Sequence, residues 1–179
     1  MTTATGVGSW PGTSAREAVR AVRDLLGADG LPYLPETPGR GPGADLVGRG
    51  AGLLVELPVD LQPMGWRFVD RPGRDAERTA ALLTEDLDEL AEAYDGYAGA
   101  LKVQVCGPWS LAASVWLARG ERALTDPGAR RDVVSSLSAG VAGLLARVRS
   151  LVPGAELVPV SYTHLRAHET VLDLVCRLL

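Results

Sequence analysis

Cysteine is the residue type in this chain best suited to nucleophilic chemistry, and Cys106 follows directly on a predicted strand. A cysteine nucleophile needs a base that ionises the thiol, and histidine is the usual one. No histidine lies among the 105 residues before Cys106. We therefore expect Cys106 to be a small buried hydrophobic residue.

Two histidines near the C-terminus have a spacing that imitates a metal site. His164 and His168 are four residues apart, Glu169 follows, and Cys176 comes two turns later, so all could share a helical face. The apolar residues of 171–178 also recur at helical spacing, which explains the pattern without a metal. We predict no metal ligands in this segment.

Two further patterns resemble known functional motifs, but each lacks a feature that the motif requires. Glu36, Glu56 and Asp60 supply the acids that a glycosidase requires, but their spacing does not select a facing pair. The glycines of segment 6–8 lack the third glycine of a dinucleotide fingerprint, and Trp10 occupies the turn where a phosphate would lie. We interpret neither pattern as a site.

Composition and charge exclude several classes of protein. The chain has 179 residues, 46% of them hydrophobic and 22% charged, as in ordinary globular domains. The formal net charge of −4 argues against a nucleic-acid partner. No apolar run approaches the ~18 residues that span a membrane, and the two cysteines are too far apart for a metal knuckle. We expect a cytoplasmic protein.

Strand and helix patterns alternate along the chain. Strands or extended segments are predicted at 3–8, 31–36, 56–71, 101–105 and from 155. Helices are predicted at 14–27, 45–54, 75–94, 109–119 and 126–152. This alternation favours an α/β fold with a parallel sheet. A closed (β/α)8 TIM-type barrel needs ~250 residues, so we predict a partial barrel, about the first four β/α units.

Local signals fix several helix starts. Ser14 and Glu17 form a capping box, Asp45 can cap the second helix, and Asp126 with Pro127 opens the last one. The helix over 75–94 has an acidic face that we interpret as solvated surface. That face consists of Asp86, Asp88, Glu89 and Glu92.

Polar residues and turn residues follow the predicted strands. Ligands bind at the carboxyl ends of parallel strands, so these residues are expected to line a pocket for a small polar molecule. They are Gly8, Ser9, Trp10, Glu36, Asp70, Arg71 and the segment Cys106, Gly107, Pro108, Trp109 and Ser110.

Three stretches of the chain resemble one enzyme family. TGVGSWPGT from Thr5 to Thr13, the run from Leu31 to Trp66, and CGPWSLAAS from Cys106 to Ser114 are similar to the C-terminal catalytic barrel of cobalamin-independent methionine synthases, in its short actinobacterial form. The resemblance extends over about residues 5–158. It implies methyl transfer from 5-methyltetrahydrofolate to homocysteine, with zinc and without cobalamin.

The resemblance also implies roles for individual residues. Ser9 matches the serine that contacts the amino-acid part of homocysteine, and Glu36 is the candidate for the substrate-facing glutamate. Ser110 replaces the threonine of the Gly-Pro turn, and Trp109 or Trp116 is the candidate for the aromatic residue on the folate side. The tryptophan that faces the folate pterin in larger relatives aligns with Ser114. No residue of this chain is assigned as a zinc ligand or as catalytic.

The C-terminal part departs from the family pattern. The resemblance predicts a strand ending in Asp-Glu-Pro, whose aspartate would hold the homocysteine amine. The chain instead continues with Pro159, which cannot donate in a central ladder. The segment from about Val160 resembles a translated sequencing-adapter tail. We therefore expect residues 1–158 to be the N-terminal half of a methionine-synthase-like barrel and residues 159–179 to be a non-native tail.

Two functional hypotheses remain open. In one, the chain is a fragment of a zinc-dependent methyltransferase and is inactive as given. In the other, it is a noncatalytic protein that binds a small metabolite or a partner, and a uroporphyrinogen-decarboxylase-like barrel is a further alternative. The methyl donor, a free folate or a corrinoid protein, is also left open.

Overall fold

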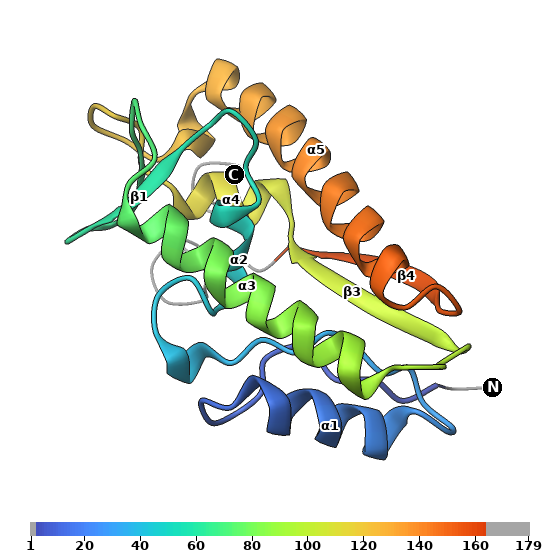
Figure 1. Cartoon of the computed structure of the whole chain (residues 1–179). Helices are drawn as coiled ribbons and strands as arrows, with labels where there is room; N and C mark the ends of the chain where they lie inside the picture. The colour runs from blue at the N-terminus through green and yellow to red at the C-terminus, as the bar shows by residue number, and fades with distance from the viewer. Residues whose placement is uncertain (1–2, 164–179) are drawn as a thin grey trace, which may run out of the picture.

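The computed structural model describes residues 3–163, which form a mixed α/β structure (Figure 1). The α-helices are α1 (Ala15–Leu26), α2 (Leu46–Gly52), α3 (Arg74–Ala93), α4 (Pro108–Ser114) and α5 (Pro127–Leu151). The strands are β1 (Val59–Gln62), β2 (Gly65–Phe68), β3 (Ala100–Cys106) and β4 (Glu156–Tyr162). Short 3-10 turns cover Pro38–Arg40 and Ala123–Thr125. The described residues do not form a closed barrel.

Three helices begin where the sequence predicts. The Ser14 hydroxyl accepts a hydrogen bond from the main-chain N–H of Glu17 at the start of α1. The Asp45 carboxylate accepts from two N–H groups at the start of α2, and the Asp126 carboxylate accepts from one in the first turn of α5. Such caps satisfy main-chain donors that have no partner inside the helix.

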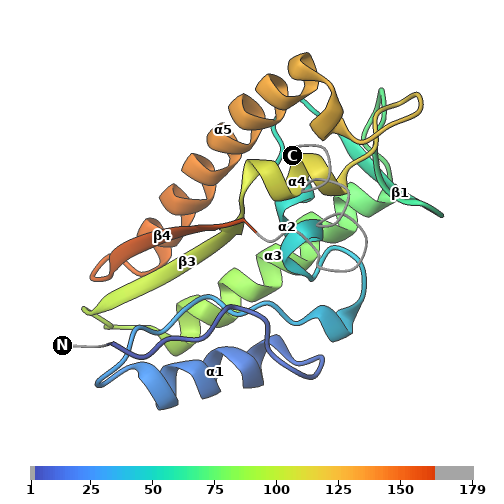
Figure 2. The same cartoon turned by 180° about the vertical axis from the view of Figure 1, so that it is seen from behind.

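Four extended segments run parallel in chain order. Ser9 pairs with Glu36, and Tyr33 pairs with Lys102, so segment 31–36 lies between segment 4–9 and β3. β3 in turn pairs with β4 over seven residues, from Ala100 opposite Glu156 onward. Figures 1 and 2 show β3 and β4 lying between α1 and α5. Among these four parallel segments, each one pairs with the next parallel segment along the chain, as is usual for β/α units.

The last strand continues past Pro159 to Tyr162. Glu156 donates its N–H to the carbonyl of Gly99, and the Tyr162 carbonyl accepts from Gly107, so alternate residues of β4 face β3. Pro159 faces the opposite edge, where its missing N–H costs no hydrogen bond of this ladder. The pairing of β4 with β3 therefore continues through this proline to Tyr162.

The segment 56–71 is not a strand of the parallel sheet. It folds into an antiparallel hairpin of β1 and β2, with Leu61 opposite Trp66. Phe68 donates its N–H to the Trp116 carbonyl, which ties the hairpin to the segment after α4. The predicted helix 109–119 accordingly ends at Ser114, because the residues after it are extended and pair with the hairpin.

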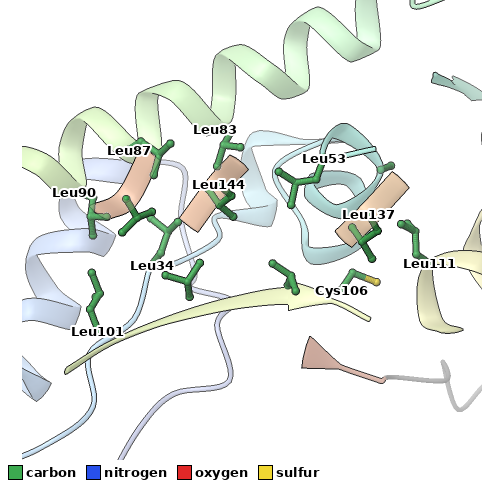
Figure 3. Close-up of a cluster of buried hydrophobic side chains, with 14 of the residues drawn as sticks. Leu34, Leu53, Leu83, Leu87, Leu90, Leu101, Cys106, Leu111, Leu137 and Leu144 are labelled. Carbon is green, nitrogen blue, oxygen red and sulfur yellow. The ribbon is translucent and has the colours of Figure 1, made fainter. Parts of the chain in front are cut away.

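The apolar core lies between one face of β3 and the helices. Figure 3 shows Leu101 of β3 pointing toward Leu87 and Leu90 of α3. Val103 and Val105 belong to the same buried cluster, whereas Lys102 and Gln104 alternate with them on the other face of the strand. Among the described helices, none is long and apolar enough to cross a membrane.

Candidate functional site

Ser9 and Glu36 lie side by side at the carboxyl ends of the first two parallel segments. The main-chain N–H of Trp10 donates to the Glu36 carbonyl at 2.7 Å, and the Glu36 N–H donates to the Gly8 carbonyl at 3.0 Å. Ser9 is exposed, but only 1% of Glu36 is exposed. The structure thus places the two residues proposed to bind substrate next to each other, with the Glu36 side chain buried beneath the exposed Ser9.

Two side chains from other elements contact the Glu36 carboxylate. The amide Nε2 of Gln104 in β3 donates to Oε1 at 2.9 Å, and the NH1 atom of Arg49 in α2 lies 3.8 Å from the same oxygen. Burial raises the pKa of Glu36, while Arg49 and the Gln104 hydrogen bond oppose that rise.

The guanidinium of Arg49 is itself held by Asp86. Its NH2 atom donates to Asp86 Oδ2 at 2.7 Å and to the Pro35 carbonyl at 2.9 Å. Arg40 also donates to Asp86, and its Nε donates to Thr37 Oγ1 at 2.6 Å. The two arginines therefore join α3 to the residues on either side of Glu36.

Asp86 was expected on the solvated face of its helix, and that interpretation is wrong. The residue is 2% exposed and pairs with two arginines. The spacing in the sequence indicates this burial. Asp86 follows Leu83 by three residues and precedes Leu90 by four, which places it on the apolar face of the helix. Burial raises the pKa of Asp86, and both arginines oppose the shift. Glu89 and Glu92 of the expected acidic face pair with arginines of α1.

Lys102 is the single lysine of the chain. It is 1% exposed, and its Nζ donates to the Gly6 carbonyl and lies 3.2 Å from the Tyr162 hydroxyl. The ammonium also lies 4.8 Å from the centre of the Tyr33 ring. Lys102 and Gln104 give β3 a polar face, and the alternation of apolar and polar residues over Leu101–Val105 is the sequence signal that indicates it.

Cys106 is buried, as predicted, and packs in the hydrophobic cluster shown in Figure 3. Burial is the main reason that its pKa is raised to about 12, and the nearby carboxylates of Asp45 and Glu36 add to the shift. The thiol is therefore protonated at neutral pH, which a cysteine nucleophile or metal ligand cannot be.

Trp109 and Ser110, the folate-side candidates, face different surroundings. Ser110 is buried, with its hydroxyl 3.5 Å from the Tyr162 carbonyl. Trp109 is 57% exposed and lines a cavity of about 530 Å³ between α4 and α5. The other lining residues are Pro108, Ala112, Pro127, Arg130, Arg131, Val134 and Ser135.

Other sequence candidates lie apart from these residues. Asp70 and Arg71 follow the β1–β2 hairpin and are exposed, so the expectation that they line the end of a parallel strand is wrong. Glu56 is exposed in the loop before β1, and Asp60 lies within the hairpin. The histidine-rich segment, with His164, His168, Glu169 and Cys176, lies outside the described residues.

The residues that the structure describes do not fit a zinc ion by themselves. No three side chains of histidine, cysteine, aspartate or glutamate come together between residues 3 and 163 in a way that could hold a metal. The described thiol, Cys106, is buried and protonated, whereas zinc binds the thiolate. Any zinc ligands would have to come from elsewhere.

Comparisons with known proteins give no match. No family model, curated protein or solved structure is similar enough to this chain to indicate a relative. The functional proposal below therefore depends on the site residues and on the motifs that carry the resemblance.

Proposed function

We propose that this chain contributes the first half of a (β/α)8 barrel of the cobalamin-independent methionine synthase type. The support at the level of the fold is the chain-order pairing of four parallel segments, with helices between them. A barrel needs this order, since each strand pairs with the one that follows it. A doubly wound sheet instead reverses its order at the first strand.

The observation that carries the proposal is the pairing of Ser9 with Glu36 at the strand ends. An α-amino acid offers an ammonium and a carboxylate on one carbon. In the proposed complex, the Glu36 carboxylate accepts hydrogen bonds from the ammonium of homocysteine. The Ser9 hydroxyl donates a hydrogen bond to the carboxylate of homocysteine. Such charge-assisted hydrogen bonds fix a small substrate more strongly than neutral ones.

The proposed reaction transfers a methyl group from 5-methyltetrahydrofolate to the homocysteine sulfur. The homocysteine thiol gives up its proton and its sulfur forms the new S–C bond as the C–N5 bond breaks. The electron pair of the broken bond stays on N5, which takes up one proton, so the proton lost by the thiol is balanced. The described residues bind and orient the substrate in this scheme. They supply no metal ligand set, so no step of it is assigned to a metal here.

The cavity between α4 and α5 supports a second candidate, a noncatalytic protein that binds a small molecule. Its volume of about 530 Å³ lies in the ~300–1,000 Å³ range of ligand pockets. The exposed indole of Trp109 offers a stacking surface, and Arg130 and Arg131 offer positive charge. In the methyltransferase proposal, the folate binds on the side of the molecule where this cavity lies.

Resequencing the source DNA beyond the codon for Val158 tests the methyltransferase proposal. We expect the reading frame to continue into Asp-Glu-Pro and later into histidine and cysteine zinc ligands. The extended protein should then form methionine from homocysteine and 5-methyltetrahydrofolate. A genome that encodes SYTHLRAHET after Pro159 and Val160 would overturn the proposal and favour the noncatalytic candidate.

A further inference from the structure

We propose that Arg49 and Gln104 act with Glu36 as an amine-recognition site, in which Arg49 positions the carboxylate and Gln104 supplies a second acceptor for the substrate ammonium. This inference rests on the proposed binding of homocysteine at Glu36. The three side chains come from the second parallel segment, α2 and β3, and each is at most 2% exposed.

The orientation of the Gln104 amide is fixed by its partners. Nε2 donates to the Leu34 carbonyl at 2.6 Å and to Glu36 Oε1 at 2.9 Å, and both of these atoms can only accept. The amide oxygen of Gln104 therefore points elsewhere, and it has no hydrogen-bond partner among the described residues. A buried acceptor without a donor is unfavourable, so it marks a place for a ligand donor.

The backbone of the first segment leaves room for this amide. Gly8 has a φ of +144°, and a Cβ atom at this position would lie 2.8 Å from Gln104 Nε2. Only glycine is compatible with both the backbone angle and the close approach. Segment 4–9 therefore brings Ser9 to the site without displacing the glutamine.

An ammonium group suits the pair of acceptors. It carries three N–H donors, of which Glu36 can take one and the Gln104 amide oxygen another. Asp86 accepts hydrogen bonds from both Arg40 and Arg49, whereas Glu36 lies 3.8 Å from Arg49 without a hydrogen bond, so Glu36 is the carboxylate that remains to face a cation. A buried ammonium is stable at this site only if Glu36 is ionised. Arg49 favours the ionised form, because its positive charge opposes the rise in the pKa of Glu36.

Arg49 lies between the two carboxylates and is held by both Asp86 and the Pro35 carbonyl. Its Nε and NH1 atoms have no hydrogen-bond partner within the described part of the chain. The charged groups that act on Glu36 are Arg49 and Asp45 from α2 and its cap and Lys102 from β3. Burial raises the pKa of the neighbouring Tyr33, and the charge of Glu36 adds to that rise. Among these groups, Arg49 opposes the rise in the pKa of Glu36 most strongly.

The acceptor role is tested by comparing two ligands on the full chain by calorimetric titration. L-Homocysteine and 4-mercaptobutanoate differ only in the amino group. We expect the wild-type chain to prefer homocysteine and the Gln104→Leu variant to lose about tenfold of that preference. Gln104→Met is the second variant if the first does not fold, and Gln62→Leu in the hairpin is the matched control.

The positioning role is tested by following the 13C signal of the Glu36 carboxyl against pH, assigned with Glu36→Gln. The pKa of Glu36 should rise in Arg49→Gln and remain near the wild-type value in Arg49→Lys, which keeps the charge. Arg20→Gln, on the exposed face of α1, should leave it unchanged. A merely structural role for Arg49 would not separate lysine from glutamine in this way.

The outcomes distinguish the two levels of the proposal. Failure of the wild-type chain to bind L-homocysteine overturns the proposed function at this site. Equal weakening of both ligands by Gln104→Leu overturns the acceptor role alone. An unchanged pKa of Glu36 in Arg49→Gln overturns the positioning role, whether or not homocysteine binds.

Discussion

At the scale of single residues, the environment decides which side chains can do chemistry. Glu36 and Cys106 both follow predicted parallel strands and both are buried. Glu36 lies opposite a guanidinium that opposes its protonation, whereas the groups acting on Cys106 all raise its pKa. The sequence showed that both residues lie at strand ends, but it did not show which charges surround them.

Cys106 should be inert toward thiol reagents while the protein is folded. With a pKa of about 12 and 1% exposure, almost none of the thiol is ionised or accessible at pH 8. In a Cys176→Ser background, we expect labelling by a disulfide reagent to be at least ~100-fold slower in buffer than in 8 M urea. Rapid labelling of the folded protein would contradict the burial of this side chain.

At the scale of elements, close packing depends on one glycine of α5. A Cβ atom on Gly140 would lie 1.7 Å from the main-chain carbonyl of Leu53, so α5 and the end of α2 approach more closely than any side chain allows. Gly143, one turn later, has nothing within 4 Å of its Cβ position. The two glycines form a matched pair in the same helix.

Alanine at these two positions should have opposite effects. Gly143→Ala should stabilise the protein by about 0.5–1 kcal/mol, because alanine favours the helical backbone. Gly140→Ala should destabilise it by about 1–3 kcal/mol, since the backbone of one element must shift. Urea denaturation of both variants measures the difference. Similar effects at the two positions would show that α5 does not pack on Leu53 as described.

Local signals predicted the elements better than the contacts between them. Caps at Ser14, Asp45 and Asp126 and the periodicity of α3 and α5 are written into neighbouring residues, and all are confirmed. The hairpin at 59–68 and the burial of Asp86 depend on partners distant in the sequence. The edge of β4 that Pro159 faces also depends on register, which the neighbouring residues in the sequence do not set.

At the scale of the whole molecule, buried carboxyl groups link stability to pH. Burial raises the pKa values of Glu36 and Asp86 above their ordinary values of 4.5 and 3.8. The folded state therefore binds these protons more tightly than the unfolded state. Stability from these groups is greatest below the ordinary values and falls as the pH rises toward the folded pKa values.

The variant Glu36→Gln isolates one of these groups. We expect the free energy of unfolding of the wild type, relative to this variant, to fall as the pH rises from 4.5, by at most about 1.4 kcal/mol per pH unit. Urea denaturation at a series of pH values checks the sign. Glu17→Gln, on the exposed surface of α1, is the control and should show a much smaller dependence. A relative stability that rises with pH would contradict the burial of Glu36.

The central claim is that the paired ends of the first two parallel segments bind an α-amino acid. It is tested most directly by titrating the 15N-labelled chain with L-homocysteine and following the main-chain amide signals. We predict saturable shifts at Ser9, Trp10, Glu36 and Thr37 that disappear in Glu36→Gln and persist in Glu17→Gln. Shifts that are absent, or that are unchanged by Glu36→Gln, would contradict the claim.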